Sequence, residues 1–265
     1  VESFSLIAIP FFILSGGFME SGGISRRLIS FSSSLVGHIR GGLSMISIVA
    51  AMFFAGISGS TAADTAAIGS VLIPAMEKKG YGKDLATSVV GTAGAIGIII
   101  PPSIPMIILG ITGSISIGGL FLGGVFPGIL MGLALMVTSG IFARKRNLPA
   151  EPKATWGERW HAFTDSILAL MTMVIIMGGI LSGVFTATEA SVVAAFYSFV
   201  VGRFVYGELK WKDIPSIMVK TGITTGVVVL CIATASSFGW ILAAEQIPDK
   251  IAKAVFALSD NRLVI

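Results

Sequence analysis

Long apolar runs separated by short clusters of charged residues dominate the chain. Several of these runs are about 20 residues long, which is enough helix to cross a bilayer at about 1.5 Å of rise per residue. The pattern predicts an all-α polytopic membrane protein. The apolar, nearly uncharged runs are residues 4–19, 43–76, 85–109, 115–143, 163–185, 187–206 and 217–244.

The run at residues 43–76 is too long for one crossing. Its 34 residues would form about 51 Å of helix, whereas the hydrocarbon core of a bilayer is ~30 Å thick. The sequence Gly56-Ile57-Ser58-Gly59-Ser60 lies at its middle, and charges flank it at Arg40 and at residues 77–79. We expect a re-entrant helical hairpin whose tip, residues 56–61, stops near the middle of the membrane and faces residues 101–103.

Two other segments depart from a plain membrane helix. Residues 85–109 contain Pro101-Pro102 and Pro105, and proline removes a backbone donor and disfavours helix at the preceding residue. We therefore expect a broken helix over residues 85–110. Residues 21–42 intersperse basic and apolar side chains, which is typical of an amphipathic helix lying along the interface. This segment is the predicted interfacial arm.

The basic residues favour the hairpin over a single crossing. With residues 43–76 returning to their starting side, 15 of the 18 Lys and Arg residues lie on the cytoplasmic side, as the positive-inside rule prefers. A single crossing would place the basic loops on alternating sides. No helix carries a basic face, so nucleic acid is not an expected partner. Cys231 is the only cysteine, which excludes a disulfide framework.

A sequence pattern that occurs twice in the chain predicts inverted repeats. Residues 11–28 contain an apolar run, Glu20 and a short amphipathic stretch, and residues 238–251 repeat this order around Glu245. The expected topology places the two copies on opposite sides of the membrane, as in secondary transporters. The predicted parts are a transmembrane helix (1–20), the arm (21–42), a first-repeat transport core (43–143, with hairpin 43–76, broken helix 85–110 and helix 115–143), a cytoplasmic loop (144–162) and the start of a second repeat (163–265).

The hairpin tip and the broken helix carry the candidate site. Irregular backbone inside a bilayer is tolerated only where it lines a cavity or packs on protein. Freed carbonyls at helix C-termini can ligate a hard cation such as Na⁺, and helix N-termini can hold a carboxylate. Packing of small residues and a plain proline kink are the structural alternatives. The candidate substrate-binding residues are Ser58, Gly59, Ser60, Thr61 and Ser103, and the candidate Na⁺ ligands are Gly56, Ser60, Asp64, Ile100, Pro101 and Ser103.

Two carboxylates have competing interpretations. Asp64 is the only carboxylate inside an apolar run of the first repeat, so it is a functional candidate, but it could equally cap the returning helix. Thr186-Ala187-Thr188-Glu189 fits a capping box, which we prefer to an ion or proton role for Glu189. Nucleotide-binding and catalytic patterns are absent from the sequence, so we do not expect an enzyme.

Four stretches of the chain match the pattern of a known family in the same order. They are Ile9-Pro10-Phe11-Phe12-Ile13-Leu14, Gly56-Ile57-Ser58-Gly59-Ser60-Thr61-Ala62, Ile100-Pro101-Pro102-Ser103-Ile104-Pro105 and Phe185-Thr186-Ala187-Thr188-Glu189-Ala190. In these stretches, and essentially from end to end, the sequence resembles the large membrane subunit of the tripartite ATP-independent periplasmic (TRAP) transporters. The resemblance implies an elevator-type carrier of the bacterial inner membrane, driven by Na⁺, for carboxylates such as C4-dicarboxylates or sialic acid. It also implies a small membrane subunit and a periplasmic substrate-binding protein as partners.

The family pattern extends beyond both ends of the chain. We expect scaffold helices before Val1 and a second hairpin after Ile265, which would complete the substrate pocket. A one-component sodium/carboxylate symporter of similar architecture is the main alternative, since it would need no binding protein. A channel is a weaker alternative, and a membrane-embedded enzyme is the weakest because paired catalytic residues are lacking.

The charge distribution predicts that residues 144–162 are cytoplasmic. A cysteine introduced at Ala154, in a Cys231→Ser background, should react with a membrane-impermeant maleimide only after the cytoplasmic face is made accessible. The positive-inside rule is the physical reason, because five of the 15 cytoplasmic basic residues lie in this loop. Labelling of Ala154→Cys from the periplasmic side of intact cells would contradict the topology.

Overall fold

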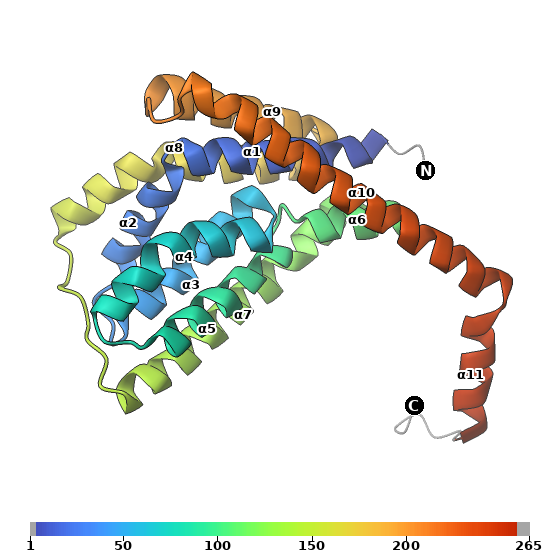
Figure 1. Cartoon of the computed structure of the whole chain (residues 1–265), viewed down its shortest axis with the longest axis horizontal. Helices are drawn as coiled ribbons and strands as arrows, with labels where there is room; N and C mark the ends of the chain where they lie inside the picture. The colour runs from blue at the N-terminus through green and yellow to red at the C-terminus, as the bar shows by residue number, and fades with distance from the viewer. Residues whose placement is uncertain (1–3, 259–265) are drawn as a thin grey trace. The chain divides into compact units, whose positions relative to one another are not determined.

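The computed structural model describes residues 4–258, and these residues form helices joined by loops without any strand (Figure 1). The chain divides into two units, Val1–Thr221 and Gly222–Ile265. The α-helices are α1 (Ala8–Ser21), α2 (Ile24–Val36), α3 (Gly42–Ser58), α4 (Thr61–Lys78), α5 (Lys83–Gly94), α6 (Ile104–Thr112), α7 (Ile117–Lys145), α8 (Trp156–Leu181), α9 (Ala187–Val200), α10 (Ile214–Ala244) and α11 (Ile247–Leu258). Shorter turns are the 3₁₀ segments η1 (Phe4–Ile7), η2 (Ala95–Ile98) and η4 (Trp211–Asp213), and the π-helical η3 (Val201–Val205).

The helices confirm the prediction of an all-α membrane protein. Within the described residues, five helical stretches are long and apolar enough to span a bilayer. Helix α3 is apolar but shorter than these. The five stretches are Phe4–Ser21, Ile117–Lys145, Trp156–Leu181, Ala187–Val205 and Trp211–Ala244.

The first unit contains two groups of helices. Helices α1, α8 and α9 lie together in Figure 1, and α2 packs on α8. We call residues 4–36 and 156–221 the frame. Helices α3, α4, α5 and α7 form the second group, with α6 packed on α7. We call residues 42–147 the hairpin body.

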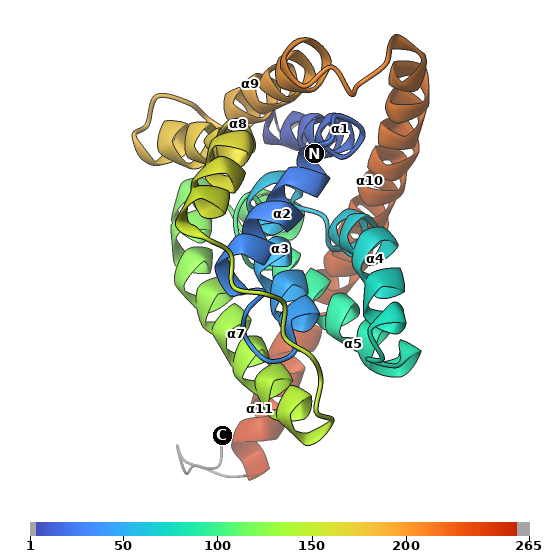
Figure 2. The same ribbon diagram turned by 90° about the vertical axis from the view of Figure 1, so that its left-hand side faces the viewer.

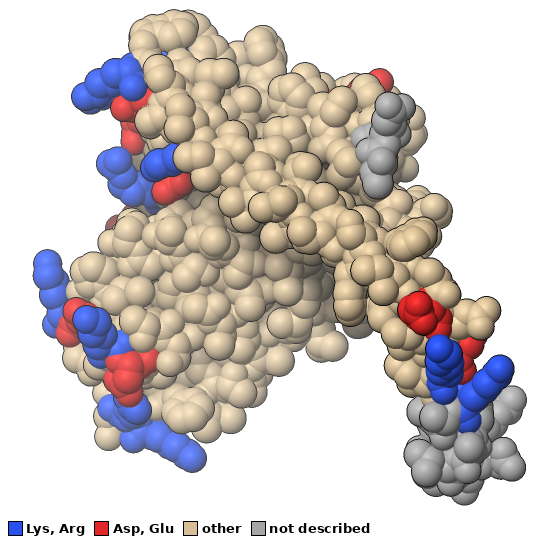
Figure 3. All heavy atoms as spheres, turned by 45° about the vertical axis from the view of Figure 1, so that its right-hand side comes forward, with Lys and Arg blue, Asp and Glu red and all other residues tan. Residues whose placement is uncertain are grey.

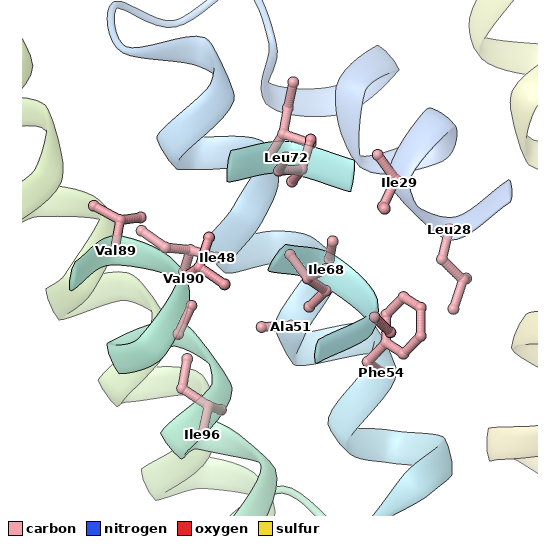
Figure 4. Packing of buried hydrophobic residues seen from close by; sticks show 14 of the residues in the cluster. Leu28, Ile29, Ile48, Ala51, Phe54, Ile68, Leu72, Val89, Val90 and Ile96 are labelled. Atoms are coloured by element: carbon pink, nitrogen blue, oxygen red, sulfur yellow. The ribbon is translucent and has the colours of Figure 1, made fainter. Parts of the chain in front are cut away.

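Helix α3 is the centre of the hairpin body. Most of its side chains are buried, because α2, α4, α5 and α7 all pack around it. Figure 4 shows Ile48, Ala51 and Phe54 of α3 close to Ile68 of α4 and Val90 of α5. A helix that is apolar on every side is stable in this position because every face meets another helix.

Three buried glycines on α7 allow the hairpin body to pack closely. Gly124, Gly128 and Gly132 recur every fourth residue and therefore lie on one face of α7. A methyl group at Gly124 would collide with the carbonyl oxygen of Ile99, and one at Gly128 would collide with the Ile100 side chain. Small residues in this spacing let membrane helices approach closely. Here they leave room for the non-helical segment that follows η2 to pack against α7.

Ion pairs join charged residues of neighbouring helices and loops in the first unit. Lys79 pairs with Glu151, and Arg146 pairs with Asp84. Arg27 pairs with Asp165 at 3.3 Å and with Glu208 at 2.7 Å, and its guanidinium lies 3.7 Å from the centre of the Tyr206 ring. Figure 3 shows the visible charges of this unit gathered mainly along one edge.

Two connectors link the frame to the hairpin body, and they are hydrogen-bonded to each other. The Gly41 N–H donates to the Pro149 carbonyl at 3.2 Å, and the Glu151 N–H donates to the Gly37 carbonyl at 2.9 Å. Figure 2 shows the second connector crossing in front of α2 and α3. The Tyr81 hydroxyl accepts from Leu43 N–H and donates to the Pro149 carbonyl. Burial raises the pKa of Tyr81, so the phenol keeps the proton that it donates.

The glycine face of α7 predicts a large difference between two adjacent substitutions. Gly124→Ala should lower the free energy of unfolding by about 1–3 kcal/mol, because the new methyl group meets backbone that cannot yield easily. Gly123→Ala is the matched control, since nothing lies within 4 Å of a methyl group there. Thermal unfolding of the complete transporter in detergent would measure both. Equal stability of the two variants would show that α7 does not pack on Ile99.

Candidate functional site

The helical hairpin is interrupted at Gly59 and Ser60. Helix α3 ends at Ser58, and Gly59 follows with φ +62°, a left-handed conformation that glycine adopts without a steric penalty. Ser60 is extended and caps α4, because its hydroxyl accepts from the Ala63 N–H at 3.4 Å. The interruption lies inside the predicted tip, residues 56–61. Both ends of the hairpin lie beside the same connector, through Gly41 and Lys79.

A second interruption separates η2 from α6. Helical structure ends at Ile98 and resumes at Ile104, and Pro101-Pro102 lies between them. Ser103 is extended and caps α6 by accepting from the Met106 N–H at 3.4 Å. The Ser103 hydroxyl also donates to the Ile98 carbonyl at 2.7 Å. One serine thus joins the two sides of the interruption.

The two interruptions are in contact. The Ile104 N–H donates to the Gly59 carbonyl at 3.4 Å, and a methyl group at Gly59 would lie 2.8 Å from the Pro102 carbonyl oxygen. Helices α4 and α6 both begin here, and their caps Ser60 and Ser103 share nearly the same backbone conformation, with φ −129° in both. Helix N-termini attract anions, whereas the ends of α3 and η2 offer carbonyl oxygens to cations.

The structure separates the predicted site residues into two groups. One group lies at the contact between the two interruptions, and the other faces other parts of the protein. Gly59, Ser60 and Ser103 lie at the contact, and Pro101 belongs to the segment that forms it. Gly56 faces α8, since a methyl group there would lie 2.6 Å from Met173 Cε. The Ile100 side chain packs against Gly128 of α7, and the Ile100 N–H bonds to the Ile96 carbonyl.

Ser58, Thr61 and Asp64 turn into the interior of the hairpin body. The Ser58 hydroxyl donates to Asp64 Oδ1 and accepts from the Ser60 N–H at 3.1 Å. Asp64 is fully buried, and among the described residues neither its Oδ2 nor the Thr61 hydroxyl oxygen has a partner. The alternative that Asp64 caps α4 is wrong, because Ser60 occupies that position. The cap precedes the helix, whereas Asp64 lies a full turn inside it.

Gly94 and Gly97 also lie in this interior region, and neither is among the site residues that the sequence predicted. A methyl group at Gly97 would lie 2.6 Å from Asp64 Oδ2, and one at Gly94 would collide with the Thr65 hydroxyl. The two glycines therefore let the end of α5 and η2 approach α4 closely. The available signal was the recurrence of glycine every third residue from Gly91 to Gly97, which marks one crowded helix face.

The capping box at the start of α9 is confirmed. Thr186 Oγ1 accepts from the Glu189 N–H at 3.3 Å, and Glu189 Oε2 accepts from the Thr186 N–H at 2.8 Å. Glu189 thus satisfies backbone donors at a helix N-terminus.

Comparison with known proteins identifies the family to which the chain is similar. The model of the DctM component of tripartite ATP-independent periplasmic transporters matches residues 1–265. A "C4-dicarboxylate TRAP transporter large permease protein" of Pseudomonas aeruginosa is 45% identical over 257 residues, covering 97% of this chain and 60% of that protein. A "putative TRAP transporter large permease protein" of Haemophilus influenzae is 43% identical over 264 residues, covering 100% of this chain and 62% of that protein.

A third relative has a different named substrate. The "sialic acid TRAP transporter large permease protein" of Vibrio cholerae is 41% identical over 265 residues, covering 100% of this chain and 62% of that protein. The chain therefore spans 60% to 62% of the length of these relatives.

The contact between the interruptions predicts unequal effects of two glycine substitutions. Gly59→Ala and Gly80→Ala both place alanine at positive φ, which costs ~1–2 kcal/mol. Gly59→Ala should cost more, since its methyl group also meets the Pro102 carbonyl, whereas nothing lies within 4 Å at Gly80. Thermal unfolding of both variants in the complete transporter would test this. A larger loss of stability for Gly80→Ala would exclude the contact.

Proposed function

The chain belongs to the DctM component family of tripartite ATP-independent periplasmic transporters, and from this premise we propose that it is the part of a large permease that carries a small organic acid across the membrane by coupling to Na⁺. Members of this family are integral proteins of the bacterial inner membrane and act as transporters, not enzymes. The proposed substrate is a carboxylate such as a C4-dicarboxylate or sialic acid, because relatives named for each match the chain.

The contact between the two interrupted helices is the observation that carries this proposal. Two helix N-termini, at Ser60 and Ser103, meet where Gly59 touches Pro102. A carboxylate there would receive N–H donors and favourable helix dipoles. Na⁺ would take carbonyl and hydroxyl oxygens from the ends of α3 and η2. Both ligands would sit near the bilayer midplane, where transporters of this design bind substrate.

An elevator movement is supported by the interface between the frame and the hairpin body. Within residues 4–221, every hydrogen bond and ion pair lies inside the frame, inside the body, or at the connectors. The groups meet through apolar and small residues instead. Gly16 of α1 packs on Ser58, Gly118 of α7 packs on Ile180 of α8, and Phe31 of α2 packs on Phe53 of α3. Such a surface can slide without breaking hydrogen bonds.

Two helix junctions support the proposed inverted repeat. Gly23 has φ +77° immediately before α2, and Gln246 has φ +51° immediately before α11. Glu20 lies near the end of α1, and Glu245 directly follows α10. Each junction joins a long apolar helix to an amphipathic helix through one left-handed residue, and this similarity supports the proposed repeat.

The proposed partners are a small membrane subunit and a periplasmic substrate-binding protein. The tripartite family model matches the chain from end to end and supports both. A one-component sodium/carboxylate symporter is the alternative. Uptake by the reconstituted membrane subunits with and without the binding protein separates the two, because only the tripartite transporter requires the soluble receptor.

Removing either serine cap should weaken Na⁺ coupling. In the complete transporter, Ser60→Ala or Ser103→Ala should raise the Na⁺ concentration for half-maximal uptake by about tenfold, or ~1.4 kcal/mol, because each removes an oxygen at the contact. Ser116→Ala is the matched control, since Ser116 caps α7 in the same way at the Gly119 N–H. The measurement is Na⁺-dependent uptake into proteoliposomes that contain the transporter, with the substrate-loaded binding protein added outside. An unchanged Na⁺ response in both test variants would show that the Na⁺ site does not lie at this contact.

Cross-linking the frame to the body should stop transport. Gly118→Cys/Ile180→Cys joins α7 to α8, where a methyl group at Gly118 would lie 3.4 Å from Ile180 Cγ2, which is within reach of a disulfide. In a Cys231→Ser background, oxidation should abolish uptake and reduction should restore it. The control pair Ser15→Cys/Ser198→Cys joins two frame helices whose hydroxyls lie 2.9 Å apart, so it should cross-link without blocking uptake. Full uptake with Gly118 and Ile180 cross-linked would rule out the elevator.

A further inference from the structure

The loop that joins α9 to α10 is folded back onto the frame. Figure 2 shows this loop at the top of the view, between the two helices. The π-helical turn η3 continues α9, and Gly207 then reverses the chain with φ +67°. The Leu209 N–H donates to the Gly202 carbonyl at 3.1 Å, and the Leu209 side chain is fully buried in one apolar cluster with Phe18. The side chains that follow Leu209 are therefore held at a fixed place on the frame.

Three basic side chains of this loop have no acidic partner. None of the ion pairs within residues 4–258 includes Arg203, Lys210 or Lys212, and both lysines are exposed. The two carboxylates of the loop have other partners. Glu208 pairs with two arginines of α2, and Asp213 Oδ2 accepts from the Lys210 backbone N–H at 3.1 Å. The loop therefore presents positive charge that the described residues do not neutralise.

An aromatic cluster holds Arg203 in place beside the two lysines. The guanidinium carbon of Arg203 lies 5.3 Å from the centre of the Trp211 ring, in a cation–π contact. The Trp211 ring packs against Phe199 with their centres 6.0 Å apart, and Phe199 packs against Phe18 with centres 5.6 Å apart. Arg203 Nε has no hydrogen-bond partner in the described part of the chain. A guanidinium is suited to phosphate, because its planar fork can donate two parallel N–H bonds.

Exposed apolar side chains lie beside the basic ones, where two helices long enough to span the membrane meet the loop. These helical stretches are Ala187–Val205 and Trp211–Ala244. Phe204 and Trp211 are both exposed, and Phe196, which precedes them on α9, is exposed as well. Tryptophan is enriched where membrane helices reach the lipid headgroups. The surface thus combines positive charge at the expected headgroup level with apolar side chains next to it.

We propose that Arg203, Lys210, Lys212 and Trp211 form a binding site for one anionic phospholipid on the frame. The lipid phosphate accepts from Arg203 and the lysines, and an acyl chain lies over Phe204. A phospholipid supplies the anion and the hydrocarbon in one molecule, whereas free phosphate supplies only the anion. The charge distribution predicts that this loop is cytoplasmic, and anionic lipids of the cytoplasmic leaflet attract Lys and Arg beside membrane helices. The inference concerns the frame alone and is independent of the proposed Na⁺ coupling.

Native mass spectrometry of the complete transporter tests the proposal, by counting the molecules of phosphatidylglycerol bound as this lipid is added to the protein in detergent. Arg203→Gln, Lys210→Gln and Lys212→Gln should each raise the lipid concentration for half-occupancy by about fivefold, the factor that one basic residue contributes near an anionic membrane surface. Trp211→Ala should also weaken binding, although it removes no charge, because it releases Arg203. The two lysine variants change only exposed side chains, so they decide the result if the others do not fold.

Matched controls come from other helix ends of the first unit. Lys145→Gln removes an exposed lysine at the end of α7 that is in none of the ion pairs of the described residues. Trp156→Ala removes an exposed tryptophan at the start of the spanning stretch Trp156–Leu181. Both variants should bind phosphatidylglycerol as the parent does. Phosphatidylcholine, which has no net charge, should bind the parent more weakly, and inorganic phosphate should not displace phosphatidylglycerol.

The outcomes distinguish a lipid site from general surface charge and from a protein contact. Weaker phosphatidylglycerol binding in the lysine, Arg203 and Trp211 variants, with parent-like controls, supports the proposal. Equal weakening by Lys145→Gln would show attraction to surface charge in general and would overturn it. Parent-like lipid binding by all the site variants would overturn it as well. If those variants also lost the small membrane subunit during purification, the surface would be a protein contact instead.

Discussion

The structure depends on how two interrupted helices satisfy their backbone polar groups. An unpaired N–H or C=O in hydrocarbon costs several kcal/mol, so a helix can stop inside a membrane only where something meets its ends. Here the ends meet each other. Ser60 and Ser103 cap the outgoing helices, the Ile104 N–H reaches the Gly59 carbonyl, and Ser103 bridges back to Ile98. The remaining carbonyls at the ends of α3 and η2 are the ones that a bound cation would satisfy.

This requirement explains why glycine is placed where it is in the hairpin body. Gly59 provides the left-handed turn, Gly94 and Gly97 admit α4 to the end of α5, and Gly124 and Gly128 of α7 make room for Ile99 and Ile100. Each removes a side chain where two backbones approach closely. The candidate site is therefore formed largely by main chain that is held in place by the packing of neighbouring helices.

Sequence reasoning was strongest where a single physical limit applied. A single helix over the 34-residue run at 43–76 would exceed the bilayer thickness, which led to the predicted interruption at its glycine-rich middle, where α3 ends and α4 begins. The double proline led to the predicted broken helix, and it lies in the non-helical segment between η2 and α6. The capping box at Thr186 was predictable because it depends only on residues close together in the sequence. Asp64 was predicted as a candidate Na⁺ ligand from its position in an apolar run, but its contacts could not be predicted, because they are made by Ser58 on α3 and Gly97 on η2. Likewise, the pairing of Arg27 with Glu208 joins residues 181 positions apart, and only the folded helices bring them together.

The connectors define how the frame and the hairpin body are joined within the first unit. Within residues 4–221 the chain passes between frame and hairpin body only at residues 37–41 and 148–155, and these two segments are hydrogen-bonded to each other. Gly41 has φ +75°, so one connector already contains a left-handed residue at the start of α3. The body is therefore tethered at one end, beside Lys79 and Tyr81, whereas the tip of the hairpin is far along the helices from that tether. Under the proposed elevator mechanism, small rotations at the paired connectors would displace the tip most, because within residues 4–221 the apolar surface along α1, α2 and α8 offers no hydrogen bond to the hairpin body that would resist them. On that proposal, the geometry that buries the proposed site would also give it the largest displacement.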